Sequence, residues 1–129
     1  MPEPEITDLR IVEAVRFVES NYARDLDFTN LAATLNLSPS RLRQLFKQQT
    51  STSFGKYLRQ VRMQRARHLL ETSFLKIKQI AEQVGIGDTS HFVRDFEKQF
   101  GMSPAQYRKS RLIAQKKSSA GRIISTTEK

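Results

Sequence analysis

The sequence predicts an all-α fold in which two similar sets of short helices are joined by one long helix. Apolar residues recur at spacings of three and four positions through most of the chain, as they do on the buried face of a helix. Gly, Asn and Ser-Pro separate these segments, and such residues favour helix ends and helix starts. One passage also occurs twice, about 50 residues apart. Together the three observations predict a helical protein with an internal repeat.

Composition narrows the class of protein. The chain has 129 residues and no Cys. This length permits one domain or two very small ones and leaves no room for a large catalytic domain. The lack of Cys excludes disulfides, thiolate metal sites and cysteine nucleophiles, and it suits a reducing cytoplasm. We expect a soluble cytoplasmic protein without an export signal, because no segment approaches the roughly 20 apolar residues of a membrane span.

The charge is unevenly distributed. The formal net charge is +9, but residues 1–37 hold 3 Lys/Arg against 7 Asp/Glu, whereas residues 38–129 hold 19 against 6. The basic part begins with the first of the two repeated passages, as expected if those passages face a polyanion. The alternative is that the basic residues only solvate helix surfaces.

Two helices are predicted before the basic part. Residues 8–23 form an amphipathic helix with a supporting role, because Ile11 and Val18 lie on one apolar face with other aliphatic residues. A shorter helix follows, in which Asp27 can cap the start and Asn36 can end the last turn.

The next helix, predicted at residues 39–49, has two different faces. Ser38 can accept hydrogen bonds from free N–H groups at its start, and Pro39 tolerates the first helical position. Its buried stripe consists of Leu42, Leu45 and Phe46, and its outer stripe of Ser40, Arg43, Gln44 and Lys47. Arg can bond guanine, Gln can bond adenine and Lys suits phosphate, so the outer stripe favours DNA recognition over an ordinary solvated face. Together with the preceding helix it predicts a helix-turn-helix.

Residues 53–72 predict a long connector helix that is apolar on two sides. One stripe contains Phe54, Leu58 and Val61, and the other contains Met63, Ala66 and Leu70. About 19 helical residues span about 28 Å at about 1.5 Å each, and successive major-groove turns lie about 34 Å apart. The length therefore suits a connector between two DNA-recognition helices. Among its basic residues, Arg62 is the candidate for a phosphate contact.

The second half of the chain repeats the first. Leu31, Ala32, Leu35 and Leu37 match Ile80, Ala81, Val84 and Ile86 at an offset of 49, and Ser40, Leu42, Gln44, Phe46, Ser53 and Tyr57 match Ser90, Phe92, Arg94, Phe96, Ser103 and Tyr107 at an offset of 50. One extra residue in the turn explains the change of offset. We expect Gly85 to end a helix in the left-handed conformation and Asp88 to cap the next helix.

This organisation predicts four segments: a first helix-turn-helix subdomain at residues 8–52, the connector at 53–72, a second helix-turn-helix subdomain at 73–114 and a flexible basic tail at 115–129. Lys116, Lys117 and Arg122 in the tail are candidates for non-specific phosphate contact.

Residues 8–112 resemble the DNA-binding domain of AraC/XylS-type bacterial transcription regulators. The matching residues are Ile80-Ala81, Val84-Gly85-Ile86, Phe92, Phe96, Gly101, Ser103-Pro104 and Tyr107-Arg108. The resemblance implies two recognition helices that enter adjacent major-groove segments of promoter DNA, RNA polymerase as a possible further partner, a monomeric DNA-binding unit and a location at the nucleoid. The chain departs from the family pattern at Ser51, usually Gly, at Ile86, usually aromatic, and at Lys76, often a capping residue.

By position, the resemblance implies base contacts from Ser40, Arg43 and Gln44 in the first recognition helix and from Thr89, Ser90, His91, Val93 and Arg94 in the second. Arg43 and Arg94 suit guanine, Gln44 suits adenine and Val93 suits a thymine methyl group. Ser38, Lys47 and Arg62 are the candidates for contacts with the DNA backbone.

Other functions are disfavoured. The only histidines are His68 and His91, and neither paired carboxylates nor a glycine-rich phosphate loop accompanies them, so we expect no enzyme, no metal and no cofactor. An RNA-binding protein would need aromatic platforms for unpaired bases, which the sequence lacks. The main alternative is a basic helical module that binds an acidic protein partner. That function would not require two matched polar stripes.

Overall fold

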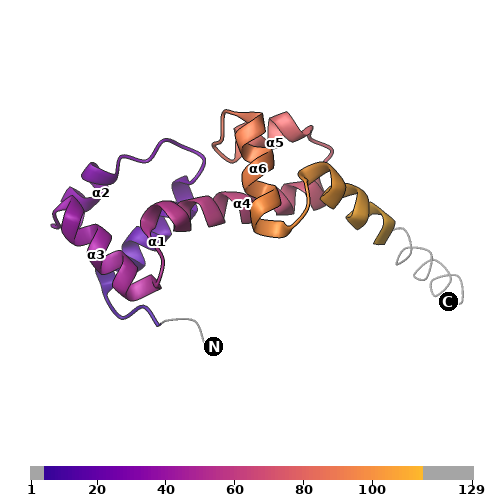
Figure 1. The fold of residues 1–129 in the computed structure, drawn as a ribbon. Coiled ribbons are helices and arrows are strands. Elements are labelled where there is room, and N and C mark those ends of the chain that lie inside the picture. Colours follow the sequence, from indigo (N-terminus) through magenta and orange to yellow (C-terminus); the bar gives the residue numbers. More distant parts are fainter. Residues whose placement is uncertain (1–4, 115–129) are drawn as a thin grey trace, which may run out of the picture. The chain divides into compact units, whose positions relative to one another are not determined.

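The computed structural model describes residues 5–114, and all of its regular structure in that range is helical. The helices are α1 (Leu9–Asn21), α2 (Phe28–Thr34), α3 (Pro39–Thr50), α4 (Phe54–Thr72), α5 (Ile77–Gln83) and α6 (Thr89–Phe100), followed by a further helix at residues 104–114 (Figure 1). The predicted all-α class is confirmed. The tail proposed at residues 115–129 lies outside the described range.

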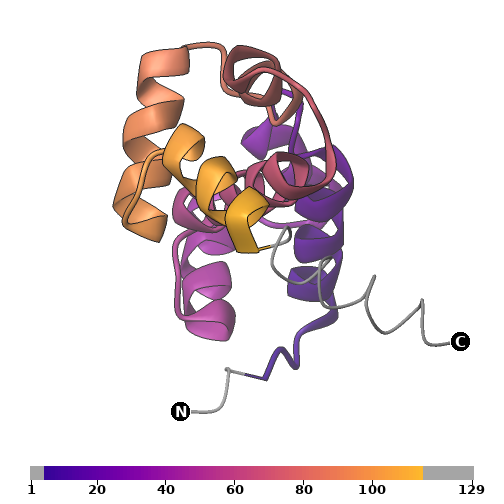
Figure 2. The same ribbon diagram turned by 90° about the vertical axis from the view of Figure 1, so that its right-hand side faces the viewer.

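The chain divides into two compact units, Met1–Gln64 and Arg65–Lys129, and the boundary falls within α4. Helix α4 therefore contributes residues to both units (Figure 1), and Figure 2 shows the helices from a second side. Each unit contains one helix-turn-helix, α2 with α3 in the first unit and α5 with α6 in the second. None of the helices at residues 5–114 is long and apolar enough to cross a membrane.

Helix starts follow the predicted capping residues. The side chains of Asp27, Ser38 and Asp88 accept hydrogen bonds from backbone N–H groups in the first turn of α2, α3 and α6. Lys76 precedes α5 and provides no such acceptor. Instead the Gln79 side-chain oxygen accepts the backbone N–H of Lys76 at 2.8 Å, so the reciprocal half of a capping box remains.

Both helix-turn-helix units use left-handed backbone at the same two steps. After the first helix, φ is 59° at Asn36 and 91° at Gly85. After the second helix, φ is 63° at Ser51 and 79° at Gly101. Because L side chains rarely adopt this conformation, Ser51 carries backbone strain that Gly101 avoids. Ser51, where the family usually has Gly, is therefore a residue whose side chain is strained by its backbone φ angle.

The two cores are built around equivalent aromatic pairs. Phe46 is fully buried and its ring centroid lies 5.5 Å from that of Tyr57 at an interplanar angle of 65°. Phe96 is also fully buried, and its centroid lies 5.8 Å from that of Tyr107 at 69°. Such edge-to-face pairs fix the second helix of each unit against the helix that follows. In α6, Phe92 and Phe96 are fully buried, whereas Phe100, one turn further on, is only half-buried.

The repeat extends further than the helix-turn-helix. Ile11, Ala14, Val18 and Glu19 of α1 match Met63, Ala66, Leu70 and Glu71 of α4 at an offset of 52, and the six apolar members of these sets are all buried. The Tyr57 hydroxyl donates to Glu19 at 3.2 Å, and the Tyr107 hydroxyl donates to Glu71. The second half of α4 therefore supports its unit as α1 supports the first unit.

Candidate nucleic-acid interface

In the first unit, α3 presents the polar face that its sequence predicts. Leu42, Leu45 and Phe46 are buried in the core with residues of α1 and α2. Ser40, Arg43, Gln44 and Lys47 are all exposed on the opposite side. The burial pattern confirms the two faces, and it leaves the four polar side chains available to an external partner.

Arg43 is exposed but restrained. Its guanidinium carbon lies 4.9 Å from the centroid of the Phe28 ring, at the first position of α2. A guanidinium over an aromatic face is attracted by the ring quadrupole. The first helix of the motif thus orients a base-contact candidate on the second.

Gln44 has a hydrogen-bond partner that was not predicted from the sequence. A guanidinium nitrogen of Arg41 donates to the Gln44 side-chain oxygen at 2.9 Å. The two residues are three positions apart, so their side chains share a helix face. This spacing is the feature of the sequence that indicates the contact. A bidentate contact with adenine uses both the oxygen and the NH₂ group of Gln44, and Arg41 already occupies one of the two acceptor positions of that oxygen.

In the second unit, α6 presents a more varied face. Ser90, His91 and Arg94 are exposed, whereas Thr89 and Val93 are half-buried. His91 Nε2 lies 2.9 Å from a carboxylate oxygen of Asp95. Because an ionised carboxylate only accepts, Nε2 is the nitrogen that carries the proton in this contact. Only the Nδ1 atom of the His91 ring then remains to form a hydrogen bond with a DNA base.

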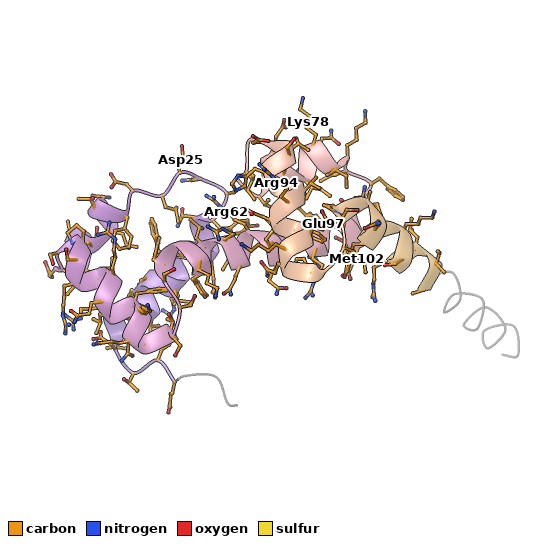
Figure 3. All side chains as sticks on the ribbon, in the orientation of Figure 1. Asp25, Arg62, Lys78, Arg94, Glu97 and Met102 are labelled. Carbon is orange, nitrogen blue, oxygen red and sulfur yellow. The ribbon has the colours of Figure 1, made fainter. Side chains whose placement is uncertain are left out.

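The two recognition helices differ in charge. Arg41, Arg43 and Lys47 are the charged residues of α3, and none is acidic. In α6, Arg94 and Lys98 are balanced by Asp95 and Glu97. Arg94 and Glu97 both project from α6 in Figure 3. The described structure therefore offers a polyanion a stronger field from α3 than from α6.

Arg62 has a structural role in the first unit. Its Nε donates to the Tyr22 carbonyl at 2.7 Å, and a second guanidinium nitrogen donates to the Arg24 carbonyl at 3.1 Å. Burial lowers the pKa of Arg62 from its ordinary value, while the charge of Asp25 opposes that shift. Both residues are labelled in Figure 3. The guanidinium thereby holds the segment that leads from α1 to α2, and its predicted phosphate contact is untested.

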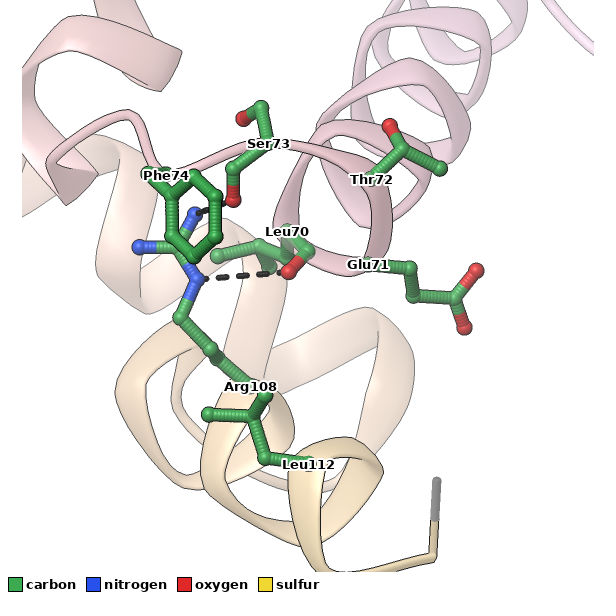
Figure 4. A pocket seen from close by; sticks show the side chains of 7 residues that line it. All are labelled: Leu70, Glu71, Thr72, Ser73, Phe74, Arg108 and Leu112. Carbon is green, nitrogen blue, oxygen red and sulfur yellow. Dashed lines mark hydrogen bonds between the residues drawn. The ribbon is translucent and has the colours of Figure 1, made fainter. Parts of the chain in front are cut away.

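Arg108 acts in the same way in the second unit. Its three guanidine nitrogens donate to the carbonyls of Leu70, Ser73 and Leu75 at 3.2, 3.2 and 2.6 Å, across the segment from α4 to α5. Beside this contact is a pocket of about 230 Å³ (Figure 4), lined by Leu70, Glu71, Thr72, Ser73, Phe74, Arg108 and Leu112. None of the predicted base-contact residues lines it.

The site chemistry is that of surface recognition. Within residues 5–114, no three His, Asp or Glu side chains are grouped so that they could hold a metal ion. What the described chain provides twice is a short helix, a turn and a second helix with an exposed polar face. These features define a tandem helix-turn-helix domain, the class of module that presents its second helix to the DNA major groove.

Known proteins share this organisation. A helix-turn-helix domain family matches residues 31–110. The chain is 37% identical over 91 residues to the uncharacterized HTH-type transcriptional regulator YpdC of Escherichia coli K12, covering 70% of this chain and 32% of that protein. It is 36% identical over 103 residues to the Msm operon regulatory protein of Streptococcus mutans, covering 80% and 37%.

Solved structures agree with the fold. The C-terminal domain of AraT, a response regulator from Geobacillus stearothermophilus, is 34% identical with a TM-score of 0.76, over 81% of this chain and 87% of that one. The DNA-binding domain of AdpA, solved in complex with a target DNA, is 27% identical with a TM-score of 0.74, over 78% and 91%.

The chain belongs to the AraC/XylS-type family of helix-turn-helix transcription regulators. It corresponds to the DNA-binding part of that family. The chain spans about a third of the length of the curated relatives it matches. Its resemblance to the family, inferred from the Phe, Gly and Ser-Pro spacings of the second unit, is confirmed.

Proposed function

We propose that this chain binds duplex DNA in a sequence-specific manner and regulates transcription from the promoter that it occupies. The observation that carries the proposal is the repeated helix-turn-helix, in which both second helices bury an apolar face and expose a polar one. A protein that bound an acidic partner through charge alone would not need this repetition. The DNA complex of the AdpA domain, which has the same fold, supports a duplex as the ligand.

The proposed base contacts come from the exposed faces of α3 and α6, which would occupy adjacent major-groove segments. They are Ser40, Arg43 and Gln44 on α3, and Thr89, Ser90, His91, Val93 and Arg94 on α6. Ser38 and Lys47 lie at positions suited to phosphate, the first at the N-terminus of α3 and the second on its exposed face. Arg62 joins this set only through N–H groups that do not already bond Tyr22 and Arg24.

The wider role follows from the proposed ligand. A promoter-bound regulator acts in the cytoplasm at the nucleoid, and contact with RNA polymerase would convert binding into altered transcription. The chain acts without a cofactor and without catalysis in this proposal, and it binds as a monomer because it carries two recognition helices of its own.

Competition binding tests the proposal. A library of random duplexes is first used to select a bound sequence, and a labelled copy is then competed with unlabelled duplex, scrambled duplex, single strands and RNA. We expect the selected duplex to compete best and the scrambled duplex to be weaker by about 10³-fold or more at physiological salt. Equal competition by every nucleic acid would refute sequence-specific duplex binding. An Arg16→Ala variant, which removes one positive charge at an exposed position of α1, should keep the preference for the selected duplex.

A further inference from the structure

We propose that Arg41 sets the base preference of α3 by holding the side-chain oxygen of Gln44, so that Gln44 faces the major groove as a hydrogen-bond donor and selects guanine over adenine. This inference rests on the proposed function, since it concerns the specificity of the same site. Arg41 is a positioning residue in this arrangement, and Gln44 makes the base contact.

The chemistry of the pair determines which way the Gln44 amide points. Arginine has only donors, so the Gln44 atom at 2.9 Å from its guanidinium nitrogen must be the oxygen. The NH₂ group is then directed away from Arg41. Both residues are exposed on α3, where Arg41 is the third residue of the helix and Gln44 follows one turn later.

The residue that caps α1 places a carboxylate near Arg41. Gln49, near the end of α3, accepts hydrogen bonds from the backbone N–H groups of Thr7 and Asp8 at 2.8 and 3.0 Å. This fixes the Asp8 carboxylate beside α3. Hydrogen bonds from Arg10 hold the pKa of Asp8 below its usual range, and the charge of Arg41 lowers it further. Arg41 therefore lies within the field of a fixed carboxylate.

The exposed groups of α3 then consist largely of donors. Guanine offers the acceptors O6 and N7 in the major groove, whereas adenine places an N6 donor beside its N7, and cytosine offers only a donor. The Gln44 NH₂ group, directed away from Arg41, matches the guanine acceptors, whereas adenine N6 would have to share the Gln44 oxygen with the Arg41 guanidinium. Arg43, held over the Phe28 ring, is also a donor and also suits guanine. We expect the half-site of α3 to be rich in guanine.

Binding-site selection with the 129-residue chain tests the assignment. Gln44→Ala identifies the base position that depends on Gln44, because selection at that position is lost. We expect the unaltered chain to prefer guanine over adenine there by at least about fivefold. Arg41→Ala frees the Gln44 oxygen for a bidentate contact, and the preference should shift to adenine.

Two control variants distinguish the positioning role of Arg41 from the effects of a lost charge or of lost folding. Gln44→Lys is a donor whether or not Arg41 is present, so Arg41→Ala should not change the base selected by that variant. Arg16→Ala removes one exposed charge elsewhere and should leave the base preference unchanged. Circular dichroism checks that each variant keeps its helix content.

The outcomes distinguish this inference from the function on which it rests. Adenine preference in the unaltered chain, an unchanged base in Arg41→Ala, or no position affected by Gln44→Ala would each overturn the role of the pair while leaving sequence-specific binding intact. Failure of the unaltered chain to select any sequence would instead overturn the proposed function, and this inference with it.

Discussion

At the scale of single residues, Arg43 and Arg94 have the same side chain in different surroundings. Arg43 lies over the Phe28 ring, while Arg94 is followed directly by the acidic Asp95. Replacement of either with Ala should cost about 1–3 kcal/mol at the selected site and relax one base preference. We expect the larger loss at Arg43, because a restrained side chain loses less entropy on binding.

Fluorescence anisotropy with a labelled duplex measures both affinities. Phe28→Leu is the matched control, since it keeps an apolar residue at the start of α2 and removes the ring beneath Arg43. That variant should weaken binding by about 0.5–1 kcal/mol through the lost cation–π contact. If Arg43→Ala and Arg94→Ala both retained the original base preference, neither arginine would recognise a base.

Tyr57 provides a pH-dependent contribution to stability. Burial, followed by the charge and the hydrogen bond of Glu19, raises the pKa of Tyr57 to about 12. A raised folded pKa means that the neutral phenol stabilises the fold fully below the ordinary value of about 10, and that this contribution is lost as pH rises towards about 12. The ultraviolet absorbance of phenolate, followed as pH rises, should therefore show a late step in the folded chain, in which Tyr57 ionises at a higher pH than tyrosine in the unfolded chain.

Tyr57→Phe should remove the contribution of Tyr57 to that late step. Tyr107→Phe is the companion variant, because burial and a hydrogen bond to Glu71 also raise the pKa of Tyr107. Titration of Tyr57 at the same pH as tyrosine in the unfolded chain would contradict the packing described for the first unit.

Local chemistry explains which residue roles were predictable from the sequence. Caps at Asp27, Ser38 and Asp88 depend on backbone groups two or three positions away, and each was predicted correctly. The roles of Arg62 and Arg41 were not predictable in the same way. Arg62 bonds carbonyls about 40 positions earlier, and the carboxylate whose pKa the charge of Arg41 lowers belongs to Asp8, which only the packing of α1 brings near α3.

At the scale of elements, the turns after α3 and α6 form a natural comparison. Ser51 and Gly101 occupy the same left-handed step, with φ of 63° and 79°. Ser51→Gly should stabilise the chain by about 0.5–1 kcal/mol, because relief of strain exceeds the added chain entropy. Gly101→Ala should cost about 1 kcal/mol through backbone strain alone, since an added methyl group meets no atom within 4 Å.

Urea unfolding followed by circular dichroism measures both changes. Gly55→Ala is the control, because Gly55 lies in α4 without a positive φ and an added methyl group there also meets no atom within 4 Å. That substitution should stabilise by about 0.5–1 kcal/mol through helix propensity. Stabilisation by Gly101→Ala would show that the left-handed turn is not required.

One side chain makes three hydrogen bonds to the backbone at the end of α4 and in the segment that leads to α5. Arg108 donates to three carbonyls there, and a lysine has no planar arrangement of donors that could replace it. Arg108→Lys should destabilise the second unit by roughly 2–3 kcal/mol. Lys109→Ala, which changes the exposed neighbouring residue, should have little effect in the same urea unfolding experiment. Equal stability of the two variants would argue against the clamp.

The extent of the repeat was only partly evident from the sequence. The matched residues from Leu31 to Tyr57 were recognised because their offsets are nearly constant. The match between α1 and the second half of α4 has a different offset, 52, and it begins inside a helix whose first half belongs to the other unit. A helix that serves two cores has two overlapping apolar patterns, and the buried residues separate them.

At the scale of the whole molecule, the formal charge of +9 is less informative than its division between recognition helices. The charged residues of α3 are all basic, whereas α6 contains two basic and two acidic residues. Each phosphate neutralised by the protein adds about 0.9 to the slope of log affinity against log salt. The first unit should therefore account for more of the salt dependence.

Binding measured over a series of salt concentrations tests this division. Lys47→Ala should reduce the slope by about 1, whereas Lys98→Ala should reduce it less, because Glu97 and Asp95 already oppose the field of α6. Glu97→Gln should have the opposite effect and raise affinity at low salt. Glu82→Gln, at an exposed position on α5, removes the same charge outside the recognition helix and should change the slope less. Equal slopes for Lys47→Ala and Lys98→Ala, with no gain from Glu97→Gln, would show that both units meet the phosphates equally.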